Sequence, residues 1–322
     1  MAASVGERDM RVSHWLFIAA AGLPLAACQR EAADPLTEAR QTCFADDAEA
    51  EAKMEACGAL IDSGELEVAE RGDAFANRGA ANYEAGDVTS ALRDYNAALE
   101  IAPENMLAVK GRALVLVESG QLDAAEPLVQ RLIQSNEFTA EAHYLAGNIA
   151  RARSDYAAAT EAYTQSIAAD RNFAPSYAGR GAIKQSQGDY PAALADFDAA
   201  IRINPQLTPA LAGRCWTRVQ MEDNNMDQAR RDADAAAEGD PRNVQAQLCR
   251  GLLQLRAGEW ANARSSYEAA LEVEPGNPSA LFGRGVARRR SGDDEGRADM
   301  NQARDFDSHV ARTFEDLGVQ TY

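Results

Sequence analysis

The chain has 322 residues, of which 46% are hydrophobic and 25% are charged, a balance typical of a folded protein. Its formal net charge is -18, so its surface repels the phosphate backbone of nucleic acids and gains nothing from anionic lipid headgroups. Composition therefore argues against nucleic-acid partners, and any attachment to a membrane needs a cause other than charge.

The N-terminal residues 1–27 have the layout of a secretory signal peptide. Arg8 and Arg11 precede an apolar run over residues 15–27 that ends in small residues. The run is shorter than the ~20 residues that a membrane-spanning helix needs. Met10 is an alternative start to Met1, since it leaves a signal of more usual length.

The end of this signal, Leu25-Ala26-Ala27-Cys28, resembles the lipobox of bacterial lipoproteins. The resemblance implies cleavage before Cys28 and lipidation of that residue with acyl chains such as palmitate, which hold a protein on a membrane. Gln29 replaces the aspartate that resembles an inner-membrane retention signal, so we expect a cell-envelope protein, on the periplasmic face of the outer membrane rather than the inner membrane. The alternative is an ordinary cleaved signal in which Cys28 has no role.

Four further cysteines, Cys43, Cys57, Cys215 and Cys249, remain in the mature chain. An even number in an oxidising compartment indicates two disulfides, and sequence order favours Cys43 with Cys57 and Cys215 with Cys249. The first pair requires the chain to reverse at residues 45–47, and the second requires two neighbouring helices in close contact. The alternative is small buried thiols. The sequence has no Cys and His cluster with metal spacing, so neither a metal nor another cofactor is expected.

The next segments are an expected linker over residues 28–46 and an N-terminal capping half-repeat over residues 47–71, built on a helix over 47–61. From residue 72 to 311 the sequence repeats itself at an interval of 34 residues. Each copy reads as two helical stretches separated by a short turn, and Pro103, Pro205 or Pro275 follows the second stretch in three copies.

These copies resemble the tetratricopeptide repeat, which implies an all-α solenoid of antiparallel helix pairs wound into a right-handed superhelix. Small residues such as Gly79 and Ala91 mark where helix backbones approach closely, and a large residue such as Tyr95 follows one turn later. Seven copies are expected, with starts at Gly72, Met106, Ala140, Ala174, Thr208, Val244 and Pro278.

Two copies depart from the pattern. The fifth has a two-residue insertion around residues 222–225, which lengthens its turn. In the seventh, Arg297 replaces the small alanine and Asn301 replaces the aromatic residue, as suits a terminal repeat whose outer face meets water. Its second helix is expected to run on through Phe306, Val310 and Phe314 as a cap, with residues 312–322 as the C-terminal cap and tail.

One repeat position carries arginine in six copies, and two explanations are open. A row of arginines could form a basic ladder for an anionic ligand. Aspartates on the partner helices of three copies favour internal ion pairs instead, because a partly buried arginine needs a partner. The arginines are Arg78, Arg112, Arg180, Arg214, Arg250 and Arg284, and the aspartates are Asp94, Asp196 and Asp232.

In this family the first helices line a concave groove that recognises partners. Carried over copy by copy, its exposed positions mix apolar and polar residues, which suits an extended peptide or an amphipathic helix. The predicted groove residues are Tyr83, Lys110, Leu114, Tyr144, Asn148, Arg151, Gln185, Trp216, Leu252, Phe282 and Arg289. Neighbouring apolar positions such as Val219 and Leu248 are alternatively packing residues between repeats.

The sequence contains no catalytic signature, so a non-enzymatic protein is expected, with no small-molecule substrate. The leading hypothesis is a lipid-anchored periplasmic scaffold or adaptor that binds partner proteins, in peptidoglycan or outer-membrane assembly. The competing hypothesis is a stoichiometric subunit of an outer-membrane protein-insertion, secretion or pilus assembly machine. Direct contact with, and regulation of, an enzyme is a third.

Overall fold

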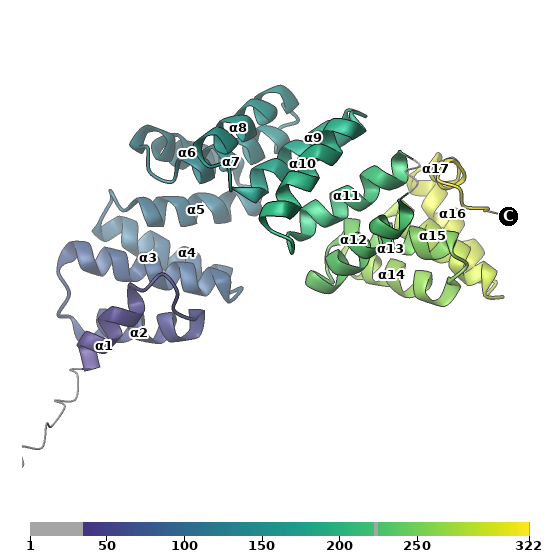
Figure 1. The fold of residues 1–322 in the computed structure, drawn as a ribbon. Coiled ribbons are helices and arrows are strands. Elements are labelled where there is room, and N and C mark those ends of the chain that lie inside the picture. The colour runs from purple at the N-terminus through teal and green to yellow at the C-terminus, as the bar shows by residue number, and fades with distance from the viewer. Residues whose placement is uncertain (1–34, 222–224, 322) are drawn as a thin grey trace, which may run out of the picture.

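The computed structural model describes residues 35–221 and 225–321, and all regular structure in these ranges is helical. The expected signal peptide, Cys28 and most of the expected insertion in the fifth copy lie outside the described residues. No helix in these ranges combines the length and the apolarity that crossing a bilayer demands. Seventeen helices are described, and successive helices pack side by side along the chain (Figure 1).

Seven helix pairs form the body of the chain, and their first helices begin at or within four residues of the expected starts. The pairs are α3 (Val68–Glu84) with α4 (Val88–Ile101), α5 (Met106–Glu118) with α6 (Leu122–Ser135), α7 (Thr139–Ala152) with α8 (Tyr156–Ala169), α9 (Ala174–Ser186) with α10 (Tyr190–Ile203), α11 (Thr208–Gln220) with α12 (Met226–Gly239), α13 (Val244–Arg256) with α14 (Trp260–Val273), and α15 (Pro278–Arg290) with α16 (Gly296–Phe306).

The turn within a pair follows from two adjacent residues. Gly86 has φ +83°, a left-handed conformation that suits a residue without Cβ, and it ends α3. Asp87 follows and caps α4, because its side chain accepts a hydrogen bond from the backbone N–H of Ser90. The third pair keeps the aspartate cap, but Ser154 with φ +62° replaces the glycine.

The core between pairs is built by an aromatic ring held between two glycines. The ring of Tyr163 lies between Gly147 on its own first helix and Gly179 on the next one. A Cβ atom at either glycine would come within 2.6 Å of this ring, so only glycine allows the approach. The same arrangement places Tyr95 between Gly79 and Gly111, Phe197 between Gly181 and Gly213, and Tyr267 between Gly251 and Gly283.

The fifth pair fills the same space with a disulfide. Cys215 and Cys249 occupy the positions of the two glycines, and Ala233 occupies that of the ring. The two cysteines are disulfide-bonded, with their Cα atoms 6.5 Å apart, and all three residues are fully buried. A large ring is thus replaced by a crosslink of comparable bulk between first helices α11 and α13.

The N-terminal cap is a helix pair rather than a half-repeat behind a linker. Part of the expected linker is helix α1 (Pro35–Cys43), which packs against α2 (Ala50–Ser63). The chain reverses between them, and the disulfide between Cys43 and Cys57 joins the two helices. This pair packs on α3 and covers that end of the solenoid.

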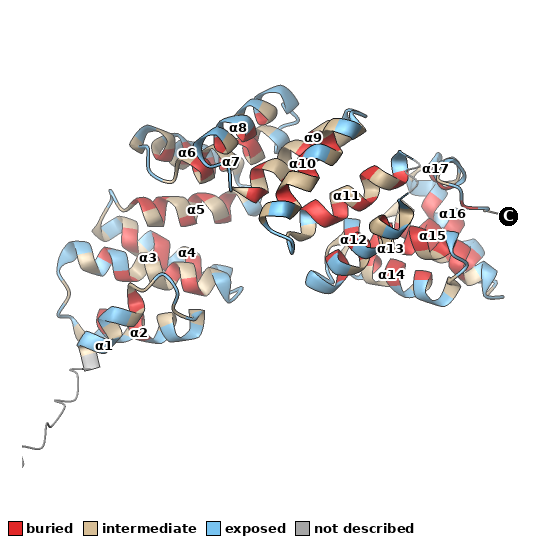
Figure 2. Cartoon of the chain, viewed as in Figure 1, coloured by how far each residue is buried: buried red, intermediate tan, exposed pale blue. Residues whose placement is uncertain are grey.

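The seventh pair corrects two expectations. Its buried small residue is Gly296 and its buried large residue is Met300, one position before the expected Arg297 and Asn301, which are exposed. The second helix also does not run on, because α16 ends at Phe306 and a separate helix α17 (Val310–Asp316) follows. Phe306 is 60% exposed, whereas Val310 and Phe314 are buried. Figure 2 shows buried residues continuing through α15 and α16 at this end of the chain.

Candidate binding cavity on the first helices

A cavity of about 1020 Å³ lies along the first helices of the third to sixth pairs. Its walls come mainly from α7, α9, α11 and α13, with α17 at its C-terminal end. Six predicted groove residues line it: Tyr144, Asn148, Arg151, Gln185, Trp216 and Leu252.

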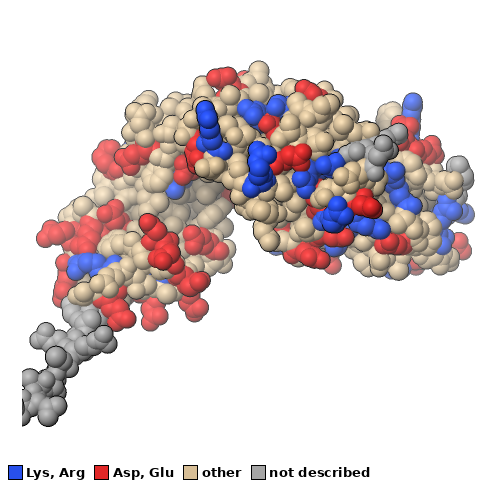
Figure 3. All heavy atoms as spheres, viewed as in Figure 1, with Lys and Arg blue, Asp and Glu red and all other residues tan. Residues whose placement is uncertain are grey.

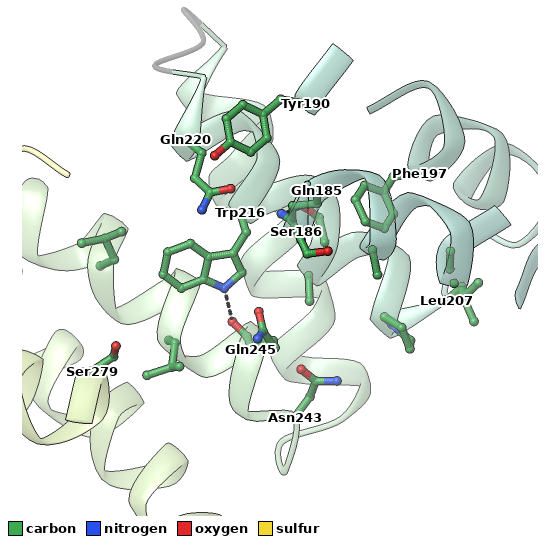
Figure 4. A pocket seen from close by; sticks show the side chains of 18 of the residues that line it. Gln185, Ser186, Tyr190, Phe197, Leu207, Trp216, Gln220, Asn243, Gln245 and Ser279 are labelled. Atoms are coloured by element: carbon green, nitrogen blue, oxygen red, sulfur yellow. Dashed lines mark hydrogen bonds between the residues drawn. The ribbon is translucent and has the colours of Figure 1, made fainter. Parts of the chain in front are cut away.

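Trp216 stands at the centre of the cavity (Figure 4). Its indole Nε1 donates a hydrogen bond of 2.9 Å to the backbone carbonyl of Gln245, which fixes the ring while leaving it partly exposed. Tyr190 and Gln220 lie on one side of the ring, and Asn243 and Gln245 lie on the other (Figure 4). A half-exposed aromatic ring held in one orientation is a typical anchor for a protein partner.

The polar groups of the cavity are mostly uncharged amides and hydroxyls. Gln185 is already engaged, because its Nε2 donates to the carbonyl of Gly213 and to the hydroxyl of Thr217. Asn148 accepts a hydrogen bond of 2.7 Å from the hydroxyl of Tyr163. The charged lining residues are one arginine, Arg151, and one aspartate, Asp316. The cavity is therefore close to neutral within a strongly acidic protein.

Charge elsewhere is unevenly spread. In the face that Figure 3 shows, acidic side chains crowd the N-terminal helices, and most of the basic side chains in view lie over the C-terminal half. The near-neutral cavity lies in that C-terminal part of the chain.

The N-terminal predicted residues lie outside the cavity and contact their own neighbours. The hydroxyl of Tyr83 donates to a carboxylate oxygen of Glu118 at 2.5 Å, and burial, then this contact, raises the pKa of Tyr83. The Nζ of Lys110 lies 4.0 Å from the ring centroid of Phe138. Burial lowers the pKa of Lys110, and the nearby Glu141 opposes that shift. Leu114 packs against the cluster of its own repeats.

Two of the predicted groove residues are buried and offer a partner almost no surface. Leu252 is 1% exposed and Phe282 is fully buried. Helix α17 covers Phe282, because the ring of Phe314 lies 5.0 Å from the ring of Phe282 and 6.4 Å from that of Tyr267, between centroids. Val219 and Leu248 are also buried, which agrees with their reading as packing residues. Arg289 is exposed but does not line the cavity.

Sequence reasoning missed the cavity residues that come from helix starts. Tyr190 begins a second helix, and Asn243 and Gln245 stand at the start of α13, whereas the groove was mapped only onto mid-helix positions. Tyr190 directly follows a Gly-Asp turn, and an aromatic residue at that place in the sequence could have indicated its exposure to the cavity.

The arginines of the repeats form internal ion pairs, as predicted for three copies. Arg78, Arg180 and Arg214 each donate two hydrogen bonds to a buried aspartate on the partner helix: Asp94, Asp196 and Asp232, respectively. The hydrogen bond to the aspartate raises the pKa of each of these arginines and outweighs burial, which lowers it. Their charge is therefore neutralised within the solenoid.

Two further copies have a fourth pair and a variant of it. Arg284 makes the same contact with Asp299, which the one-residue shift of the seventh copy had hidden. Arg250 bonds instead to the hydroxyl of Ser266 and to the side-chain carbonyl of Gln247. These five arginine side chains therefore do not form a basic ladder for an anionic ligand.

A further feature of the described part of the chain is how its metal-binding side chains are placed. Among residues 35–221 and 225–321, no cluster of His, Cys, Asp and Glu could hold a metal ion. The arrangement offers shape, aromatic surface and amide hydrogen bonds, which are the means of binding a polypeptide.

Family models described as tetratricopeptide repeat match most of the chain. They cover residues 82–149, 140–173, 174–207, 218–266 and 250–303. A comparison with curated proteins found no match.

Several solved structures are similar to this chain. The crystal structure of the APC/C hetero-tetramer Cut9–Hcn1 is similar at 14% identity and a TM-score of 0.62, over 88% of this chain and 56% of that one. This chain thus spans little more than half the length of that relative. YrrB, a TPR protein with an unusual peptide-binding site, matches 58% of this chain and 97% of its own, at 20% identity and a TM-score of 0.43. TTC0263 from Thermus thermophilus matches 57% of this chain and 99% of its own, at 15% identity and a TM-score of 0.49.

Proposed function

Because this chain belongs to the tetratricopeptide-repeat family, we propose that it is a lipid-anchored periplasmic scaffold that binds a segment of a partner protein in the cavity around Trp216. The observation that carries the proposal is the half-exposed Trp216 ring, held by Gln245 among amide side chains on rigid first helices. Solenoids present such concave surfaces for binding, and a preformed surface avoids an ordering cost when the partner arrives.

The lining of the cavity favours a polypeptide of low charge. One arginine and one aspartate face it, so it offers no strong attraction for phosphate groups or for a highly charged segment. Side-chain amides can both donate and accept, which matches the alternating N–H and C=O groups of a peptide backbone. Tyr144, Tyr190 and Trp216 supply apolar surface for its side chains.

The cell-envelope location is supported by cysteine chemistry. Both described disulfides join neighbouring helices, and such bonds form and persist in an oxidising compartment. The lipobox-like segment before Cys28 agrees with export. An anchor at Cys28 would hold the cavity close to the membrane and raise the local concentration of its partners, in peptidoglycan or outer-membrane assembly.

The binding proposal is tested with Trp216→Ala, and Trp260→Ala is a matched control because Trp260 lies on second helix α14 outside the cavity. Partners would be captured by crosslinking in membranes of the native organism. We expect Trp216→Ala to lower capture at least tenfold, by loss of an aromatic anchor, while Trp260→Ala leaves it unchanged. Equal capture by both variants would contradict the cavity assignment, and a partner present in constant ratio would favour the machine-subunit alternative.

Anchoring is tested separately with Cys28→Ala. We expect the variant to move from the membrane fraction to the soluble periplasmic fraction, because the acyl chains that supply the membrane affinity would be absent. Mass analysis of the wild-type N-terminus should show an acylated Cys28. A Cys28→Ala variant that stays with the membrane would contradict lipid anchoring, and it would leave the cavity assignment intact.

A further inference from the structure

The C-terminal segment packs against the last pair and borders the cavity. Val310, Phe314 and Val319 are buried in the core cluster that includes residues of α13 and α15, and Leu317 packs against it. The Nη2 of Arg290 donates a hydrogen bond of 3.1 Å to the backbone carbonyl of Gln320. The segment therefore covers a surface of α15 and α16 beside α13, which we call its seat.

This segment is built differently from the repeats it covers. Helix α17 has seven residues, and it is separated from α16 by residues 307–309. One side of the segment lines the open cavity, through Thr313, Asp316 and Leu317. The segment is thus a single short helix at the edge of the cavity, and its seat continues the surface that contains Trp216.

The seat contains a polar atom that the segment leaves unpaired. In the third pair the hydroxyl of Tyr163 donates to Asn148, but Leu252 stands at the position equivalent to Asn148 beside Tyr267. The hydroxyl of Tyr267 is buried and makes no hydrogen bond to any residue that the structure describes. The ring of Phe314 lies 6.4 Å from the ring of Tyr267, between centroids, and it has no polar atom that could form a hydrogen bond with this hydroxyl. An unpaired buried hydroxyl destabilises the arrangement that buries it.

We propose that this seat is a helix-binding site whose external ligand is an amphipathic helix of a partner protein, and that α17 occupies it until the partner arrives. The ligand carries apolar side chains at the spacing of Val310, Phe314 and Leu317, and a polar side chain that reaches the hydroxyl of Tyr267. This spacing, i, i+4 and i+7, is that of helices bound in apolar grooves. The inference rests on the proposed function and names the kind of partner segment.

Helix α17 and a partner helix would compete for the seat, because α17 is covalently attached to the same chain. A segment attached to the same chain has a high effective concentration at its seat, so a partner helix binds only to the fraction of molecules in which α17 has left. Weakening the attachment of α17 must then strengthen the binding of a helix added from outside.

The test uses the full chain and a synthetic peptide of its residues 307–321 as the probe. Three chains are titrated with labelled peptide: wild type, Phe314→Ala, and the control Arg312→Ala, whose side chain is exposed. We expect Phe314→Ala to bind the peptide at least tenfold more tightly than wild type, and Arg312→Ala to match wild type. A peptide with Phe314→Ala should bind none of the chains.

Three results would overturn the inference. A Phe314→Ala chain that keeps its helices and does not bind the peptide would show that α17 is a permanent cap. Hydrogen exchange that opens α13 and α15 in this variant would show that α17 belongs to the fold. The milder variant Leu317→Ala, at a partly buried residue, repeats the comparison with less risk to folding. Loss of partner capture in Trp216→Ala with no effect of Phe314→Ala would retain the scaffold and reject the helix seat.

Discussion

Replacing Cys215 and Cys249 together with alanine is expected to lower the stability of the fifth and sixth pairs by about 3 kcal/mol, a typical effect of losing a disulfide that closes a loop of this length. The loss should exceed that of an exposed crosslink, because the bond also fills the space that an aromatic ring fills in other pairs. A solenoid opens locally, so hydrogen exchange should rise in α11 and α13 and stay unchanged in α5 to α8.

A rescue variant distinguishes two contributions of the disulfide to stability: the space that it fills and the crosslink that it forms. The triple change Cys215→Gly, Ala233→Tyr and Cys249→Gly recreates the glycine, ring and glycine arrangement of the neighbouring pairs. We expect it to recover most of the lost protection and to be insensitive to a reducing agent. Two results together would contradict the view that the disulfide fills the space of the aromatic ring. These are a triple variant less protected from hydrogen exchange than wild type and a double alanine variant as stable as wild type.

The second large effect is expected for Asp232→Ala. Asp232 is buried and binds the guanidinium of Arg214, whose side chain is 13% exposed. Removing one partner of a buried pair leaves a desolvated charge and costs about 3–5 kcal/mol. Thermal unfolding with hydrogen exchange should place the loss in α11 and α12.

Two controls accompany this variant. Asp198→Ala removes the second partner of Arg214, a carboxylate that is 43% exposed, and should cost less than about 1 kcal/mol. Replacing both partners, with Arg214→Met and Asp232→Leu, should restore much of the stability, since no charge stays buried. Equal losses for Asp232→Ala and Asp198→Ala would show that burial does not decide the effect.

The periodic part of the fold could be predicted because the residues that pack each helix pair recur in the sequence of each repeat. A glycine, an aspartate cap and an aromatic residue recur at fixed positions, and the facing Arg and Asp positions predicted the pairs of Arg78, Arg180 and Arg214. Periodicity failed where the spacing changed by one residue. Asp299 and Met300 lie one position earlier than the pattern expects, so the sequence hid both the fourth ion pair and the packing residue.

The site was less predictable, because a groove position is exposed only if nothing else covers it. Leu252 and Phe282 occupy positions that face the groove in the family, but both are buried, and Phe314 of the chain's own C-terminal segment covers Phe282. A non-repeating segment has no internal copy that reveals where it packs. Helix α1 was not predicted because it too lies in a non-repeating segment.

The scaffold account is tested most directly by site-specific photocrosslinking in membranes of the native organism. A photoreactive residue would replace Gln220, which is exposed in the cavity, and in a second chain Ala195, which is exposed on second helix α10. The account predicts a discrete crosslinked protein from position 220 that disappears when Trp216→Ala is added, and none from position 195. The same products from both positions, or products at position 220 that survive Trp216→Ala, would contradict it.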